Sequence, residues 1–297
     1  MTSPLDRAAK LRVWRAPAKV NLTLHILGRR EDGWHDLDSI VAFAGCGDVL
    51  SFTAGPELTL TVEGPTAQKA GPTDDNLVLK AATLLQERIP PLRAGAFHLN
   101  KRLPVAAGLG GGSSDAAAAL RALADENDLA LDDPRLGEAA RACGADVFVC
   151  LDPRARIMTG VGDVLGTRLK IPPLQTVLVN PGAAVATPAV FARLGLAKGQ
   201  RTSGGPSPRL PVGGARDAIV AALRQGRNDM EEAALSIAPI IGEALAALRE
   251  SGALLARMSG SGATCFGLYG DRTTSLSAAR TIARTYPAWW VKATVLK

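Results

Sequence analysis

The glycine-rich stretch LPVAAGLGGGSSD, residues 103–115, constrains this chain more than any other segment. Its glycines let the backbone turn sharply and approach a ligand without a Cβ in the way. The alanines of residues 116–119 follow at once and are the strongest helix formers, while Ser113 and Ser114 are the expected N-cap residues. A helix N-terminus presents free N–H groups and the positive end of its dipole, and both attract anions. We therefore expect a glycine loop that binds a phosphate-bearing ligand.

This loop differs from the two most familiar phosphate-binding fingerprints. A Walker A loop has a lysine after its last glycine, where this chain has Ser113. A Rossmann fingerprint reads GxGxxG, and Ser113 takes the place of its final glycine. A flexible linker is the alternative, but linkers rarely lead straight into an alanine-rich helix. The loop therefore indicates nucleotide binding of a third kind.

The composition is that of a globular protein, because 47% of the 297 residues are hydrophobic and 21% are charged. The length suffices for one large domain or two domains of ordinary size. The N-terminal residues lack the apolar region of a secretory signal, and no apolar run approaches the roughly 18–20 residues of a membrane span. We expect a cytoplasmic protein with no membrane association.

The net charge of +6 and the isoelectric point near 9.4 are compatible with two classes of partner. The arginines are dispersed and aromatic residues make up only 4% of the chain, so the sequence offers no stacking platform for nucleic acid. An enzyme that handles polyanionic small molecules explains the positive charge equally well. We expect a small-molecule substrate, no nucleic acid, and a monomer or homodimer.

Cysteine and histidine positions give no metal motif. The four cysteines, Cys46, Cys143, Cys150 and Cys265, form no CxxC pair and are expected to be thiols in a reducing compartment. The three histidines lie far apart in the sequence. The ligands of any metal ion therefore stay unknown at this stage.

Hydrophobic periodicity and turn residues predict strands interleaved with helices. The expected strands are 20–27, 58–62, 96–100, 176–180, 254–258, 264–269 and 290–296. The expected helices are 74–87 (capped by Asp74 and Asp75), the segment from the glycine loop to about 124, 134–143, 217–224, 239–249 and 276–285. Residues 198–215, rich in Gly, Pro and Ser, are expected to form a loop. This alternation predicts an α/β or α+β protein with two layers, divided between Gly160 and Ile171 into domains 1–165 and 166–297.

Two segments near the N-terminus carry side chains suited to ligands. Lys19 and Asn21 are two residues apart on the polar face of the expected strand 20–27 and its approach, where they could hold an anionic or hydroxyl-bearing group. The alternative is a strand face open to water. Trp34 and His35 lie in a glycine-flanked turn and suit a heterocycle, although a lone aromatic residue in a loop is more often a packing residue.

Three more features are ambiguous when each is taken alone. Lys101 and Arg102 place positive charge just upstream of the glycine loop, or are simply solvated at a strand end. The turn MSGSGAT, residues 258–264, lets backbone approach a ligand, but hairpin turns use the same residues. Asp146, after Gly144, has the default interpretation of a carboxylate at the end of a helix or strand.

Taken together and in this order, the motifs resemble the galactokinase, homoserine kinase, mevalonate kinase and phosphomevalonate kinase (GHMP) superfamily. PAKVNL (17–22) is similar to its first motif, LPVAAGLGGGSSDAA (103–117) to its phosphate loop and MSGSGATCFGLY (258–269) to its third motif. The resemblance spans Ala16 to Tyr269. It implies a two-domain α/β (α+β) fold, with an N-terminal ribosomal-protein-S5-like ATP-binding and catalytic domain and a C-terminal ferredoxin-like, substrate-binding domain.

Further segments narrow the resemblance within the superfamily. They resemble the branch that phosphorylates the 2-hydroxyl of a cytidine diphosphate-linked methylerythritol. These segments are GRREDGWHDLDSI (28–40), GADV at Asp146 and the pair NPG…TPAVF (180–191). That reaction belongs to the non-mevalonate route to isoprenoid precursors and uses ATP and Mg²⁺. Phosphoryl transfer needs a site that binds the phosphates of ATP, a magnesium ion and an oriented substrate hydroxyl. The motifs provide the kinds of residue that this reaction needs.

The resemblance also implies a role for individual residues. Asp146 would be the base for the substrate hydroxyl, and Lys19 beside it would lower its pKa and stabilise charge on the attacking oxygen and γ-phosphate. The substrate's polyol and cytidine parts would be bound by Asn21, Trp34, His35, Thr187 and Phe191, with Trp34 and Phe191 on the two faces of the cytosine. ATP would be bound by Lys101, Pro104, Val105, Ala106, Ala107, Gly108, Leu109, Gly110, Gly111, Gly112, Ser113 and Ser114.

The chain departs from the family pattern at several places. Trp34 stands where tyrosine is usual, Phe148 where proline is usual, and Val105–Ala107 where glycine is more frequent. Asp115 replaces the common asparagine and places a negative charge near the phosphate site, where a magnesium ion could offset it. The alternatives are another small-molecule kinase of the superfamily, a non-catalytic nucleotide-binding relative, or a nucleic-acid-binding module.

Overall fold

The structure is a computed structural model that describes residues 12–297, and its chain forms two compact units. The first unit consists of the described residues up to Ala18, Gly47–Val105 and Gly111–Asp152. The second consists of Lys19–Cys46, Ala106–Gly110 and Pro153–Lys297. Strands β1 (Arg12–Asn21) and β3 (His35–Ala54) each contribute residues to both units.

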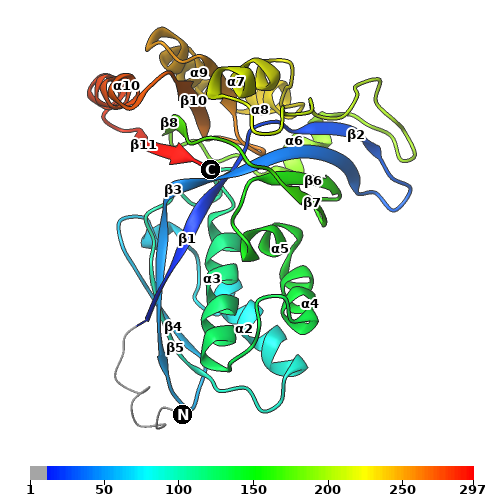
Figure 1. The fold of residues 1–297 in the computed structure, drawn as a ribbon, viewed down its shortest axis with the longest axis vertical. Coiled ribbons are helices and arrows are strands. Elements are labelled where there is room, and N and C mark those ends of the chain that lie inside the picture. The colour runs from blue at the N-terminus through cyan, green and yellow to red at the C-terminus, as the bar shows by residue number, and fades with distance from the viewer. Residues whose placement is uncertain (1–11) are drawn as a thin grey trace. The chain divides into compact units, whose positions relative to one another are not determined.

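The first unit packs four helices against a small mixed sheet. Strand β4 (Thr59–Glu63) pairs in parallel with β5 (Gly95–Asn100), and β5 pairs antiparallel with residues 49–54 of β3. A parallel pair needs a crossover, and α2 (Leu77–Arg88) provides it, together with the short 3-10 helix η1 (Ala67–Lys69). The remaining helices are α3 (Gly111–Glu126), α4 (Pro134–Cys143) and α5 (Ala145–Leu151). Figure 1 shows the helices of this unit gathered on one side of its strands.

Helix α3 is the interior helix of this unit, because it contacts α2, α4 and α5. Between Ser114 and Ala124 every residue except Arg121 is buried. Most of these residues are alanines, whose small side chains let neighbouring helices approach closely at native packing density. The alanine run that predicts a helix therefore also explains why this helix lies in the centre of the unit.

The second unit contains a four-stranded antiparallel sheet in the order β11-β8-β10-β9. These strands are β8 (Leu174–Asn180), β9 (Leu255–Met258), β10 (Cys265–Tyr269) and β11 (Trp290–Leu296). Helix α9 (Ile240–Glu250) precedes β9, and α10 (Arg272–Thr285) joins β10 to β11. The β-α-β-β-α-β succession with this strand order is the ferredoxin-like arrangement, as the resemblance implies.

The rest of the second unit surrounds strands β2 (His25–Arg29) and residues 35–46 of β3, which pair antiparallel. Strand β6 (Arg156–Gly160) pairs with β3 and with β7 (Val164–Arg168). Three short helices complete the unit: α6 (Thr187–Arg193), α7 (Arg216–Arg224) and α8 (Glu231–Ile237). Residues 202–215 form neither helix nor strand, which confirms the expected loop.

The mixed α/β class is confirmed, but the expected strand 20–27 is wrong. Strand β1 ends at Asn21 and β2 begins at His25, because Leu24 leaves the ladder to exchange backbone hydrogen bonds with Arg227 and Asp229. The expected Asp74–Asp75 cap is also wrong, since Asn76 caps α2 by accepting from the backbone N–H of Val78 at 3.0 Å.

The expected boundary between residues 165 and 166 stays a prediction. The compact units are not contiguous in sequence, because residues 19–46 and 106–110 group with the C-terminal half. Strands β3, β6 and β7 and helices α5, α6 and α8 were not expected from the sequence.

The first half of β1 passes so close to β3 that only glycine fits at position 47. A Cβ on Gly47 would lie 2.2 Å from the carbonyl oxygen of Ala16 and 2.6 Å from the Cα of Pro17. Both atoms belong to backbone, which cannot swing away as a side chain can.

We predict that Gly47→Ala lowers the free energy of unfolding by about 1–3 kcal/mol, the usual cost of overpacking an interior. Denaturant unfolding of the purified variant measures this change. Gly270→Ala is the matched control, because a Cβ there meets no atom within 4 Å. Equal losses in the two variants would contradict the steric explanation.

Candidate active site

The three sequence motifs meet at one point of the second unit. The backbone N–H of Lys19, at the end of β1, donates to the carbonyl of Leu109 in the glycine loop at 2.8 Å. The Ser259 hydroxyl, in the turn between β9 and β10, accepts from the backbone N–H of Asn21 at 3.1 Å. The same hydroxyl donates to the carbonyl of Gly108 at 2.9 Å. One serine thus joins the strand, the loop and the turn.

The glycine loop has a backbone conformation that favours glycine. Ala106, Gly108 and Gly110 all have φ between +50° and +74°, a region that costs a residue with a Cβ about 1 kcal/mol or more. At Gly108 a Cβ would also lie 2.3 Å from the carbonyl oxygen of Ser259. The loop is therefore shaped by its glycines and is held by the turn against which it packs.

Lys19 and Asn21 form a buried polar pair, with exposed fractions of 4% and 2%, so the alternative of a strand face open to water is wrong. The Lys19 ammonium donates to Oδ1 of Asn21 at 3.2 Å. The Asn21 amide donates to the Ser39 hydroxyl at 2.7 Å, which donates to the carbonyl of Thr23 at 2.5 Å. This chain of hydrogen bonds fixes the orientation of the amide and leaves a lysine charge in a largely dry environment.

The helix after the loop begins earlier than expected. Helix α3 begins at Gly111, so Ser113 and Ser114 lie inside its first turn and the N-cap assignment is wrong. Ser114 is buried and its hydroxyl donates to the carbonyl of Pro17 at 2.8 Å, whereas Gly112 is exposed. The physical reason is that the glycines already complete the turn before Gly111, so the helix needs no serine to begin it.

Lys101 lies buried in the first unit between two carboxylates. Its Nζ donates to Oδ2 of Asp48 at 2.5 Å and to Oδ2 of Asp115 at 2.7 Å. The other oxygen of Asp48 accepts from the backbone N–H groups of Arg102 and Leu103. Asp115 is in the first turn of α3, so the lysine connects the segment that enters the glycine loop with the helix that leaves it. Removing one partner of such a buried pair typically costs about 3–5 kcal/mol.

This cluster corrects the interpretation of the Asp115 charge. Lys101 provides the positive charge that offsets it, where the sequence suggested a magnesium ion. One ammonium between two carboxylates still leaves an excess negative charge, and Oδ1 of Asp115 is buried without a hydrogen-bond partner. Burial raises the pKa of Asp115 to about 8 against the opposing effect of Lys101. Burial lowers the pKa of Lys101, but the two carboxylates outweigh it and raise that pKa overall.

Asp146 lies in the first turn of α5 in the first unit, half-buried. Negative charge is favourable near a helix N-terminus, and Gly144 before it has an extended backbone. Lys19 belongs to the second unit. The catalytic roles of Asp146 and Lys19 stay predictions.

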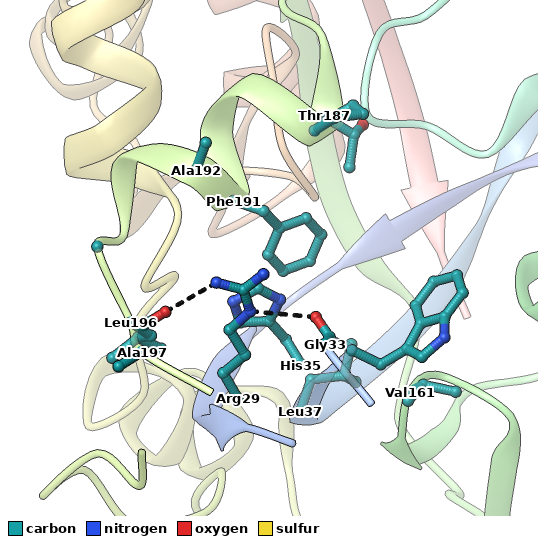
Figure 2. Close-up of a pocket in the computed structure, with 13 residues that line it drawn as sticks. Arg29, Gly33, His35, Leu37, Val161, Thr187, Phe191, Ala192, Leu196 and Ala197 are labelled. Carbon is teal, nitrogen blue, oxygen red and sulfur yellow. Dashed lines mark hydrogen bonds between the residues drawn. The ribbon is translucent and has the colours of Figure 1, made fainter. Parts of the chain in front are cut away.

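The residues expected to bind the heterocycle line one cavity of about 760 Å³ in the second unit (Figure 2). The rings of His35 and Phe191 stack with centroids 4.5 Å apart and an interplanar angle of 22°. Trp34 also lines the cavity and is 66% exposed. Thr187, at the start of α6, lines it too and shares a hydrogen bond with the Ser261 hydroxyl at 2.7 Å. The structure thus brings Trp34, His35, Thr187 and Phe191 together, and it pairs Phe191 with His35.

Some residues of these sites were not expected from the sequence. In the sequence, Ser259 and Ser261 are only small residues of a turn, and Arg29 is one residue of the GRREDGWH segment. Asp48 and Ser39 carry no local signal, because their partners are up to 55 residues away in the sequence. A composition or spacing rule could not have found them.

The described residues show no metal cluster. Across residues 12–297, no three His, Cys, Asp or Glu side chains gather in a group that could hold a metal ion. All four cysteines lie in this range and none of them forms a disulfide. Among the described helices, none is both long and apolar enough to cross a membrane.

Comparison with known proteins shows the family of this chain. The model of the GHMP kinases N-terminal domain matches residues 76–152, and that of the GHMP kinases C-terminal domain matches residues 215–290. Together they cover more than half of the chain, which therefore belongs to the GHMP kinase family. These matches include the glycine loop after residue 102, Asp146 and the Ser259 turn.

Similar proteins indicate the group of GHMP kinases to which the chain belongs. The 4-diphosphocytidyl-2-C-methyl-D-erythritol kinase of Methylobacterium radiotolerans is 59% identical over 284 residues, covering 95% of this chain and 98% of its own. The enzyme of the same name from Methylorubrum extorquens is 58% identical, with coverage of 95% and 98%. A crystal structure of 4-(cytidine 5'-diphospho)-2C-methyl-D-erythritol kinase is 33% identical, covers 96% of this chain and 99% of its own, and superimposes with a TM-score of 0.75. Within the GHMP kinases, the chain belongs to this group.

We predict that Asp115→Asn makes stability less dependent on pH. A folded-state pKa raised from 3.8 to about 8 means that the folded protein binds this proton more tightly than the unfolded chain. The stability of the wild type should therefore fall as pH rises through that window. The raised pKa of Lys101 changes stability only above pH 10.5, which lies outside this pH window.

Denaturant unfolding between about pH 5 and pH 9 measures the difference. Asp125→Asn, on the same helix but 55% exposed at its side chain, is the control and should keep the wild-type slope. An Asp115→Asn profile as steep as that of wild type would show that Asp115 does not retain its proton in the folded state.

Proposed function

We propose that this chain uses ATP to phosphorylate the 2-hydroxyl of 4-diphosphocytidyl-2-C-methyl-D-erythritol, in the non-mevalonate route to isoprenoid precursors. The observation that carries the proposal is the cavity of Trp34, His35 and Phe191, found in a GHMP kinase whose relatives at 54–59% identity bear this substrate's name. The cavity offers flat rings beside a hydrogen-bonding imidazole, which suits a cytosine.

The glycine loop is the proposed site of the ATP phosphates. Backbone N–H groups of the segment from Pro104 to Ser114 would hold the phosphate oxygens, with the N-terminus of α3 adding its dipole. Lys101 would act at this end of the nucleotide. Its contacts with Asp48 and Asp115 support a further role for it, which is to fix both ends of the loop before ATP arrives.

Mg²⁺ is the proposed companion of ATP, and it supplies charge neutralisation for the transferring phosphoryl group. Magnesium usually keeps several waters and takes few protein ligands besides substrate phosphates. The lack of a three-ligand cluster among the described residues fits an ion held mainly by the nucleotide.

The proposed reaction is a direct displacement. The substrate 2-hydroxyl oxygen attacks the γ-phosphorus, the bond from that phosphorus to the β–γ bridging oxygen breaks, and ADP leaves. Asp146 accepts the hydroxyl proton, because an alcohol is a poor nucleophile at neutral pH without a base. Lys19 stabilises the charge on the attacking oxygen and the γ-phosphate, while Asn21 orients the polyol.

The heterocycle is proposed to bind in the 760 Å³ cavity. Trp34 and Phe191 would contact its faces, His35 would bond its polar edge, and Thr187 would hold the wall formed by α6. A cytoplasmic location agrees with the use of ATP and with four cysteines outside disulfides. The oligomeric state, monomer or homodimer, stays a prediction.

The decisive experiment is ADP release by purified protein with ATP, Mg²⁺ and 4-diphosphocytidyl-2-C-methyl-D-erythritol. Homoserine, mevalonate and a sample without acceptor are assayed beside it. Release with the diphosphocytidyl compound alone supports the proposal. Release with another alcohol would keep the kinase and refute the substrate, and no release with any acceptor would favour a nucleotide-binding protein without catalysis.

We predict that Asp146→Asn lowers kcat by about 10²–10⁴-fold, the usual contribution of a general base. The KM for ATP should change little, because the amide keeps the size of the carboxylate. Steady-state kinetics of ADP release measures both constants. Unchanged kcat would remove Asp146 from the mechanism.

We predict that Trp34→Ala raises the substrate KM roughly tenfold and leaves kcat nearly unchanged, since stacking on a base contributes about 1–3 kcal/mol. Trp289→Ala is the matched control, because Trp289 stacks on Tyr286 at 3.7 Å and is not among the cavity residues. A loss confined to kcat would contradict a stacking role for Trp34.

A further inference from the structure

Arg29 connects the two backbone segments that form the walls of the heterocycle cavity. Its Nε donates to the carbonyl of Gly33 at 3.2 Å, in the turn between β2 and β3. Its Nη1 donates to the carbonyl of Leu196 at 3.1 Å, in the segment after α6. The first segment carries Trp34 and His35, and the second continues from Phe191. Figure 2 shows the guanidinium with both of these hydrogen bonds.

Arg29 is also one of only two ionisable side chains among the thirteen described residues that line the cavity, and His35 is the other. The Nε2 atom of His35 is buried and has no hydrogen-bond partner. A buried polar atom without a partner is unfavourable unless a ligand or water satisfies it. The wall of the cavity therefore contains an imidazole with one unsatisfied nitrogen and a guanidinium that is held by two backbone carbonyls.

The charge of Arg29 also acts on this imidazole. Burial, and after it the positive charge of Arg29, lowers the pKa of His35 below its ordinary value. His35 is therefore neutral at physiological pH. A neutral imidazole offers one N–H donor and one acceptor nitrogen, whereas the charged form offers two donors. The pair thus suits an uncharged heterocycle that carries both donors and acceptors on its edge.

We propose that Arg29 is a positioning residue for the heterocycle, which holds the wall of Trp34 and His35 at a fixed spacing from the wall of Phe191. The two backbone bonds use two of the five N–H donors of the guanidinium, and the others can donate to a ring carbonyl. Lysine could not replace it, because a single ammonium lacks the planar fork that reaches two carbonyls at once. The inference rests on the proposed function, since it concerns the same cavity.

The test compares Arg29→Met with Arg30→Met in steady-state kinetics and in calorimetric binding of cytidine 5'-diphosphate. Arg30 is the next residue along the chain, pairs with Asp32 at 3.0 Å and is not among the cavity residues. We expect Arg29→Met to raise the substrate KM and the Kd for cytidine 5'-diphosphate about tenfold or more. Its kcat, its KM for ATP and its melting temperature should stay close to those of Arg30→Met.

A second pair, Arg29→Lys and Arg30→Lys, keeps the charge and tests the bridge between the walls. Arg29→Lys should give an intermediate KM, because it restores the cation and at most one backbone bond. If Arg29→Met does not fold, this pair carries the test alone. Equal KM values within either folded pair would overturn the proposal, as would a loss in kcat with an unchanged KM.

The two proposals can fail separately. Wild-type protein that phosphorylates a different alcohol would refute the proposed substrate and leave the role of Arg29 to be decided by binding of cytidine 5'-diphosphate. Wild-type protein that uses the diphosphocytidyl substrate with the same KM as Arg29→Met would refute the role of Arg29 alone.

Discussion

The hydroxyl of Ser259 is the contact on which the arrangement of the second unit's motifs depends. It accepts from the backbone of Asn21 and donates to the backbone of Gly108, so it uses both of its hydrogen-bonding functions on main chain. The loop and the turn are so close that a Cβ on Gly108 would lie 2.3 Å from the carbonyl oxygen of Ser259. The left-handed conformation of the loop is unfavourable alone, and these bonds offset that cost. The loop is thereby held in one shape without a ligand, which lowers the entropy lost on binding.

Buried charge in the first unit is balanced within one cluster. The Lys101 ammonium lies between Asp48 and Asp115, so opposite charges neutralise most of one another away from water. These contacts favour a structural role for the charge of Lys101. In the second unit, the Lys19 ammonium is also buried and donates to the amide oxygen of Asn21.

The sequence predicted most of the C-terminal half, because its helices and strands have clear periodicity and are separated by Gly, Pro or Asn. It failed near residues 20–27, where alternating apolar residues continue through a turn and hide the break at Leu24. Strand β3 was not expected because Gly45, Gly47 and Asp48 interrupt its apolar pattern, and each of them is explained only by a distant partner. Local pattern cannot report a close approach between segments that are far apart in sequence.

The candidate site was predictable to the extent that it consists of contiguous motifs. The glycine loop and the pair Trp34–His35 could be found as short strings. In the structure the loop packs against the Ser259 turn, and Trp34 and His35 line the cavity. Residues that hold the walls of the site, such as Arg29, could not be found in this way. Arg29 donates hydrogen bonds to backbone carbonyls, and every residue type has a backbone carbonyl. A side chain that recognises main chain leaves no complementary residue in the sequence. Residues of this kind set the spacing between the walls of a cavity. Substrate specificity is therefore harder to predict from a sequence than the type of reaction, which the motifs indicate.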